Sequence, residues 1–95
     1  MVIAATALIS RSDRAIDRQL ADRGGAVLLN LDTGAYYALN PIGLLIWSML
    51  SEDLTFEQLV ARLRAEIDDA PPALDDEVAD FLAMLEKREL VVIRG

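Results

Sequence analysis

The hydrophobic pattern of this chain changes near its middle from short extended segments to helices. Residues 26–31 and 35–39 are rich in aliphatic and aromatic side chains, and residues 32–34 (Asp-Thr-Gly) between them are typical of a hairpin turn. An earlier segment, residues 15–20, is followed by the turn signal Asp-Arg-Gly-Gly at 22–25. Three strands joined by short turns predict an antiparallel meander, whose first and third strands form the edges.

Side chains at alternate positions of a strand lie on the same face of a sheet. In the third predicted strand, Tyr37 and Leu39 therefore share one face, and Tyr36 and Ala38 share the other. The apolar spacing in residues 15–20 also fits one face of a helix, but the turn that follows favours a strand.

Three helices are predicted after the strands, each with its own start signal. The first begins at Asn40-Pro41, a favoured N-cap followed by a favoured first helical residue, and ends near Ser51. The second begins at Thr55 with a capping box, and the third covers about 74–88. The residues expected to face the core are Ile42, Leu45, Ile46, Met49 and Leu50, with Trp47 on their flank, then Phe56, Leu59, Val60, Leu63 and Ile67, and finally Val78, Phe81, Leu82 and Leu85.

Both ends of the chain are expected to be extended. Residues 3–9 form a lead-in within an N-terminal arm (residues 1–12) that either pairs with the sheet or packs as an arm, and residues 90–93 form a short apolar last segment. Residues 1–95 are thus predicted to be a single α+β domain. A three-stranded antiparallel sheet followed by three helices suggests a winged helix-turn-helix-like fold.

Composition excludes several kinds of chemistry. The 95 residues include no cysteine and no histidine, which removes the usual zinc sites and the Ser-His and Cys-His nucleophile pairs. The net charge of −7 lies entirely in residues 52–95, which carry twelve acidic and five basic side chains. Residues 1–51 carry four of each. Such an acidic half repels nucleic-acid phosphates and anionic lipid, and attracts a basic peptide.

The remaining chemical candidates have simple structural explanations. The acids at 75–77 and Asp80 fit a solvated helix face near a positive helix end better than a metal site or an acid–base pair of a metal-dependent hydrolase. A DNA-binding winged helix would need a basic recognition helix, and the predicted second and third helices carry more acids than bases. No segment approaches the ~20 apolar residues of a membrane span, and the N-terminus lacks a signal-peptide pattern, so a cytoplasmic location is expected.

The third predicted strand offers a binding edge. Residues 35–39 are short and uncharged, so nothing in their side chains blocks pairing with another strand. An extended peptide could add there and place alternate side chains between the sheet and a covering helix. The competing explanation is that the edge is simply short, or is covered by the N-terminal arm.

The run LLNLDTGAYYALNPIG at 28–43, followed by Trp47, resembles the PqqD-like family. Members of this family are RiPP recognition elements, small winged-helix domains that bind the leader segment of a ribosomally made precursor peptide. The similarity extends from about Ala15 to Val92, and its later part includes the spacing of Val78, Phe81, Leu82 and Leu85. It implies three strands followed by three helices.

The resemblance implies a peptide site and no catalytic residue, cofactor or metal. The leader would pair antiparallel to the third strand, in the cleft beside the third helix. Acidic side chains of that helix would receive basic residues of the leader. The implied peptide-binding residues are Ala35, Tyr36, Tyr37, Ala38 and Leu39 on the strand, and Asp76, Glu77, Val78, Asp80, Phe81, Met84 and Leu85 on the helix.

The resemblance also implies partners. The motif Leu39-Asn40-Pro41-x-Gly43 is most similar to the stand-alone B1 protein of lasso-peptide biosynthesis, which presents the precursor to a separate leader peptidase. The related protein of pyrroloquinoline quinone synthesis instead presents its precursor to a radical-SAM enzyme, and this alternative stays open. The exposed sheet face, expected to carry Leu28, Tyr36 and Ala38, is a candidate contact for the enzyme.

Overall fold

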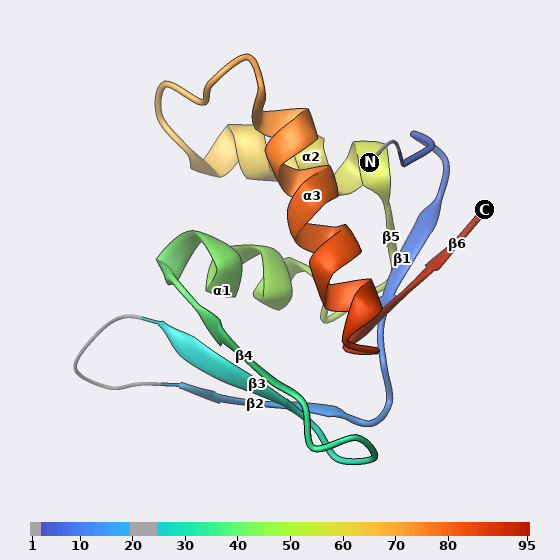
Figure 1. Ribbon diagram of the computed structural model, residues 1–95. Helices are drawn as coiled ribbons and strands as arrows, with labels where there is room; N and C mark the ends of the chain where they lie inside the picture. Colours follow the sequence, from blue (N-terminus) through green and yellow to red (C-terminus); the bar gives the residue numbers. More distant parts are fainter. Residues whose placement is uncertain (1–2, 20–24) are drawn as a thin grey trace.

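Two small antiparallel sheets and three helices make up the fold of this chain (Figure 1). The computed structural model describes residues 3–19 and 25–95. The helices gather on one side of the sheet that contains β2, β3 and β4 (Figure 1). In chain order the elements are β1 (Leu8–Arg11), β2 (Ala15–Gln19), β3 (Ala26–Asn30), β4 (Tyr36–Leu39), α1 (Pro41–Met49), β5 (Leu54–Thr55), α2 (Phe56–Glu66), α3 (Leu74–Lys87) and β6 (Val91–Arg94).

The β2-β3-β4 sheet is the predicted meander, with β2 and β4 at its edges. β3 pairs antiparallel with both neighbours and places Leu28 opposite Tyr37. Gly34 adopts φ +75° in the turn between β3 and β4, a conformation that glycine reaches at little steric cost. The predicted end of the first strand at Leu20 and the turn residues 22–24 lie outside the described residues.

The second sheet, with strand order β5-β1-β6, was not predicted, because the sequence indicated only the meander as a sheet. β1 is its central strand, and Ile9 lies opposite both Leu54 and Ile93. The predicted N-terminal arm therefore contributes a strand, and the sheet that it joins does not include β4. The expected C-terminal strand is present as β6. Within the described residues, no strand covers the outer edge of β4.

One hydrophobic core joins the helices to the inner face of the meander. Trp47 is 1% exposed, which confirms its expected place in the core. The buried side of α1 is rotated from the prediction, because Gly43, Ile46 and Trp47 face inward whereas Ile42 is 45% exposed. Almost every residue of α1 is apolar, so its sequence does not define a single buried face.

Arg11 of β1 holds the C-terminal end of α1. Its guanidinium carbon lies 4.5 Å from the centroid of a Trp47 ring, and its Nε and Nη2 donate hydrogen bonds to the Trp47 carbonyl oxygen. A positive charge at a helix C-terminus is stabilising. Burial lowers the pKa of Arg11 from its usual value, and the nearby Asp17 carboxylate acts in the opposite direction.

Asn30 at the end of β3 is 2% exposed, and its side-chain amide is fully used. The Asn30 Nδ2 donates to the carbonyl oxygens of Glu89 (2.7 Å) and Arg88 (3.4 Å), directly after α3. The Asn30 Oδ1 accepts hydrogen bonds from the backbone N–H groups of Asp32 and Thr33. This one side chain therefore joins the β3–β4 hairpin to the C-terminal end of α3.

Candidate functional site

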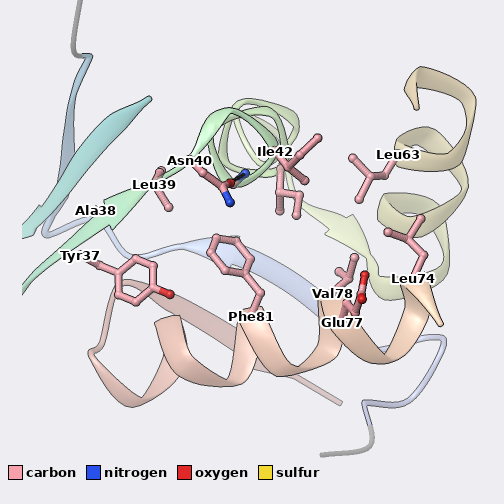
Figure 2. Close-up of a pocket in the computed structure, with 12 residues that line it drawn as sticks. Tyr37, Ala38, Leu39, Asn40, Ile42, Leu63, Leu74, Glu77, Val78 and Phe81 are labelled. Carbon is pink, nitrogen blue, oxygen red and sulfur yellow. Dashed lines mark hydrogen bonds between the residues drawn. The ribbon is translucent and has the colours of Figure 1, made fainter. Parts of the chain in front are cut away.

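A cavity of about 200 Å³ opens where β4 ends, between α1 and α3 (Figure 2). Six of the residues predicted for the binding site line it, and one residue from α2, Leu63, closes its far side. Apolar side chains dominate the walls, with Asn40 and Glu77 as the polar members. The predicted site residues in this lining are Tyr37, Ala38, Leu39, Glu77, Val78 and Phe81.

Phe81 is the centre of the cavity wall. Figure 2 shows its ring projecting from α3 toward Leu39 and Ile42. The rings of Phe81 and Tyr37 make an edge-to-face contact with centroids 6.1 Å apart and planes at 64°, an arrangement that aromatic pairs favour. On the other side of this pair, the Arg88 guanidinium carbon lies 5.0 Å from the Tyr37 ring centroid. Tyr37 therefore contacts both Phe81 and Arg88 at the end of the cleft away from Leu74.

Gly43 keeps the cavity open from the side of α1. The Asn40 Oδ1 accepts a hydrogen bond from the Gly43 N–H at 2.7 Å, as an N-cap does, and this contact fixes the first turn of α1. A Cβ atom on Gly43 would stand 3.2 Å from the Leu39 Cδ2 atom and 3.4 Å from the Phe81 Cζ atom. Any side chain there would therefore enter space that the cavity now uses.

The free edge of β4 presents backbone hydrogen-bonding groups beside this cavity. The Asn30 N–H donates to the Ala35 carbonyl oxygen at 2.8 Å, which marks that pair as a hydrogen-bonded pair of the β3–β4 ladder. Such pairs alternate along an antiparallel ladder, so Tyr37 and Leu39 direct their backbone groups toward β3. Tyr36 and Ala38 direct theirs away from β3, toward the open edge.

Charged side chains lie at the two ends of the cleft. Asp76, Glu77 and Asp80 are exposed on the first half of α3, and Glu77 belongs to the cavity lining. Lys87 and Arg88 lie at its other end. The positive end of the helix dipole favours the acids and the negative end favours the bases. The cleft thus has acidic side chains at one end, and the basic side chains Lys87 and Arg88 lie at the other end.

Not all predicted site residues lie in the cavity. Ala35 precedes β4 and belongs to the hairpin rather than to the cavity lining. Met84 is 42% exposed and lies in a shallow hollow that Lys87 and Arg88 also line. Leu85, which was predicted for the cleft wall, is not among the residues that line the cavity. Its side chain is fully buried in the core, because the cleft-facing side of α3 passes through Phe81 and leaves Leu85 on the inner side.

The cavity also contains residues that the site prediction missed. Asn40, Ile42, Gly43 and Ile46 come from the start of α1, and Leu63 and Leu74 come from α2 and α3. The sequence did offer one signal, because an Asn N-cap followed by a glycine three residues later leaves a gap on the first helical turn. No comparable signal marks Leu63 and Leu74, since their proximity depends on how α2 and α3 pack.

The outer face of the meander also differs from expectation. Leu28, expected on the exposed face, is fully buried, because its partner Tyr37 lies on the face that the helices cover. The exposed face instead places Leu29 opposite Tyr36, which is 71% exposed, with Ile16 on the adjoining strand. Strand alternation separates the two faces within each strand, but it does not fix the register between β3 and β4, which places Leu28 opposite Tyr37 and not beside Tyr36.

Two general features of the described part bear on possible functions. Over residues 3–19 and 25–95, no cluster of three or more acidic side chains is placed to hold a metal ion. In the same part of the chain, no helix has the length and apolar character that a membrane crossing requires.

Comparisons with known proteins identify relatives of this chain. A sequence model of the family described as coenzyme PQQ synthesis protein D (PqqD) matches residues 25–91, which include the meander from β3 onward and all three helices. The chain is similar to a solved structure of TbiB1 in complex with the TbiA(beta) leader peptide. The two are 34% identical, with a TM-score of 0.74, over 86% of this chain and 93% of TbiB1. No curated protein sequence matches this chain.

Proposed function

The chain belongs to the PqqD family, and we propose that it binds the leader segment of a ribosomally made precursor peptide and presents that peptide to a processing enzyme. The observation that carries the proposal is the open edge of β4 directly beside an apolar cavity. Its similarity to TbiB1, whose structure contains a leader peptide, supports the same function. In this proposal residues 1–95 act as one non-catalytic binding domain without a cofactor.

The leader would bind as a fourth strand of the meander, antiparallel to β4. Tyr36 and Ala38 would each exchange two backbone hydrogen bonds with the peptide, because their N–H and C=O groups point outward. The peptide residues just before the paired segment would then lie over the cavity. An engineered cavity of about 150 Å³ holds a benzene molecule, so a cavity of about 200 Å³ can accept one aromatic side chain from the leader.

The enzyme partner is proposed from the family and from the relative. We favour a leader peptidase of lasso-peptide biosynthesis, with a radical-SAM enzyme as the alternative, and both would place the protein in the cytoplasm. We also propose that the fold is winged-helix-like. A DNA-binding regulator is the competing function, and the acidic character of residues 52–95 disfavours it.

Calorimetric titration with synthetic leader peptides, encoded by precursor genes beside the gene of this protein, tests the proposal. We expect saturable binding with Kd of about 1 μM or lower, which corresponds to about −8 kcal/mol. Absence of heat and of competition for every neighbouring leader would refute it. Salt-dependent binding of duplex DNA in the same buffer would instead support the regulator.

A further inference from the structure

One face of α3 carries an acid, an aromatic ring and a base in order along the cleft. Leu74, Glu77 and Phe81 follow one another at spacings of three and four residues, which places them on one face of the helix, and all three line the cavity. Arg88, seven residues after Phe81, continues the same row just beyond the helix end, where it lies over Tyr37. An extended peptide in the cleft would therefore pass a carboxylate at one end and a guanidinium at the other.

Arg88 is held in a position suited to receiving a carboxylate. The Asn30 amide binds its carbonyl oxygen, and its guanidinium lies over the face of the Tyr37 ring. Stacking uses the face of the guanidinium and leaves the N–H donors in its plane directed sideways. A guanidinium fixed in this way loses little conformational entropy when it binds a carboxylate. It lies beside β4, where a peptide added to that strand would leave the cleft.

Glu77 is the counterpart of Arg88 at the cavity end. Its exposed carboxylate belongs to the cavity lining, and it lies in the first turn of α3, where the helix dipole favours a negative charge. A basic side chain of the peptide can reach it while the neighbouring apolar side chain enters the cavity. Phe81 separates the two charged positions, so an uncharged residue suits the middle of the peptide.

We propose that the cleft recognises the order of charges in its peptide, a basic residue first and an acidic residue about five positions later, with apolar residues between them. The inference rests on the proposed function, which supplies the antiparallel orientation. Glu77 and Arg88 are eleven positions apart on α3, or about 16 Å at ~1.5 Å per residue. An extended strand covers that distance in about five residues at ~3.3 Å each.

Selection from a random dodecapeptide library displayed on phage tests this inference. The wild-type protein should enrich Lys or Arg about five positions before Asp or Glu. Glu77→Lys should replace only the first preference with an acid, and Arg88→Glu should replace only the second with a base. Glu66→Lys and Arg94→Glu make the same charge changes at exposed positions outside the cavity, so they should keep the wild-type preference.

Direct binding of the selected peptide gives a second readout. In fluorescence anisotropy, Arg88→Glu should weaken binding about tenfold, and replacing the acid of the peptide with lysine should restore it. The inference is overturned if all variants select the same sequences, if acid precedes base, or if the library yields no enriched sequence. If the leader titration still gives saturable binding in any of these cases, the proposed function stands without the charge order.

Discussion

Replacing Ala38 with proline tests whether the peptide binds as an added strand. The N–H group of Ala38 points away from β3, so proline removes a donor that only an added strand would use. The meander keeps its own hydrogen bonds, and edge strands tolerate proline at such positions. The residue before a proline must be extended, and Tyr37 already lies in a strand. Ala38→Pro should therefore fold.

The expected loss of affinity follows from the lost hydrogen bond. A net hydrogen bond contributes about 0.5–1.5 kcal/mol, and a carbonyl group of the peptide left buried without a partner costs about 1–3 kcal/mol. Since 1.4 kcal/mol is a factor of ten in Kd, we expect Ala38→Pro to weaken leader binding by about ten- to hundredfold or more. Calorimetry measures the loss, and far-UV circular dichroism checks that the variant is folded.

A proline on the other edge strand is a matched control. The Leu31 N–H donates to the Arg14 carbonyl oxygen, so the alternation along the β2–β3 ladder directs the N–H of Asp17 away from β3. Asp17→Pro removes an outward donor from β2 and should leave leader binding unchanged. A folded Ala38→Pro variant with wild-type affinity would refute strand addition at β4.

Three further variants test the cavity, the hairpin and the buried amide. Gly43→Leu should fill the cavity and weaken leader binding at least tenfold in calorimetry, and unchanged affinity would show that no peptide side chain enters the cavity. Asn30→Ala should lower the free energy of unfolding by about 2–4 kcal/mol in urea denaturation, because buried backbone groups lose their partners, and a loss below about 1 kcal/mol would contradict this. Gly34→Ala should cost about 1 kcal/mol in the same assay, since φ is +75° there, and an unchanged midpoint would refute strain.

Local signals predicted much of this fold correctly. The Asn40 cap and the Thr55 capping box begin α1 and α2 as expected, because each signal needs only its own helical turn. The hairpin around Gly34 was equally clear from the sequence. The sheet of β1, β5 and β6 was not, because it joins one short strand to two others more than forty residues away. Pairing over that distance leaves no local pattern.

The candidate site was predictable only in part. The strand side of the cleft followed from the alternation of Tyr37 and Leu39, which needs no knowledge of distant packing. Predicting the helix side requires the rotation of α3 about its own axis. The sequence spacing alone did not separate Phe81 at the cavity from Leu85 in the core. The wall formed by Leu63 arises from the way α2 meets α3. The contact of Arg88 with Tyr37 likewise depends on tertiary packing, in this case of the C-terminal end of α3 against the meander.

The hydrogen bonds of the Asn30 side-chain amide hold one end of α3 more firmly than the other. They fasten the C-terminal end of α3 to the β3–β4 hairpin through directional hydrogen bonds. At the Leu74 end, α3 is held by apolar contacts and an exposed ion pair between Arg64 and Asp75, which resist displacement less. Tilting α3 about the Asn30 end would widen the cavity while the separation of Arg88 from β4 stays nearly constant. Mutations could then change the size of the peptide side chain that the cavity accepts, without altering the proposed alignment of the peptide on β4.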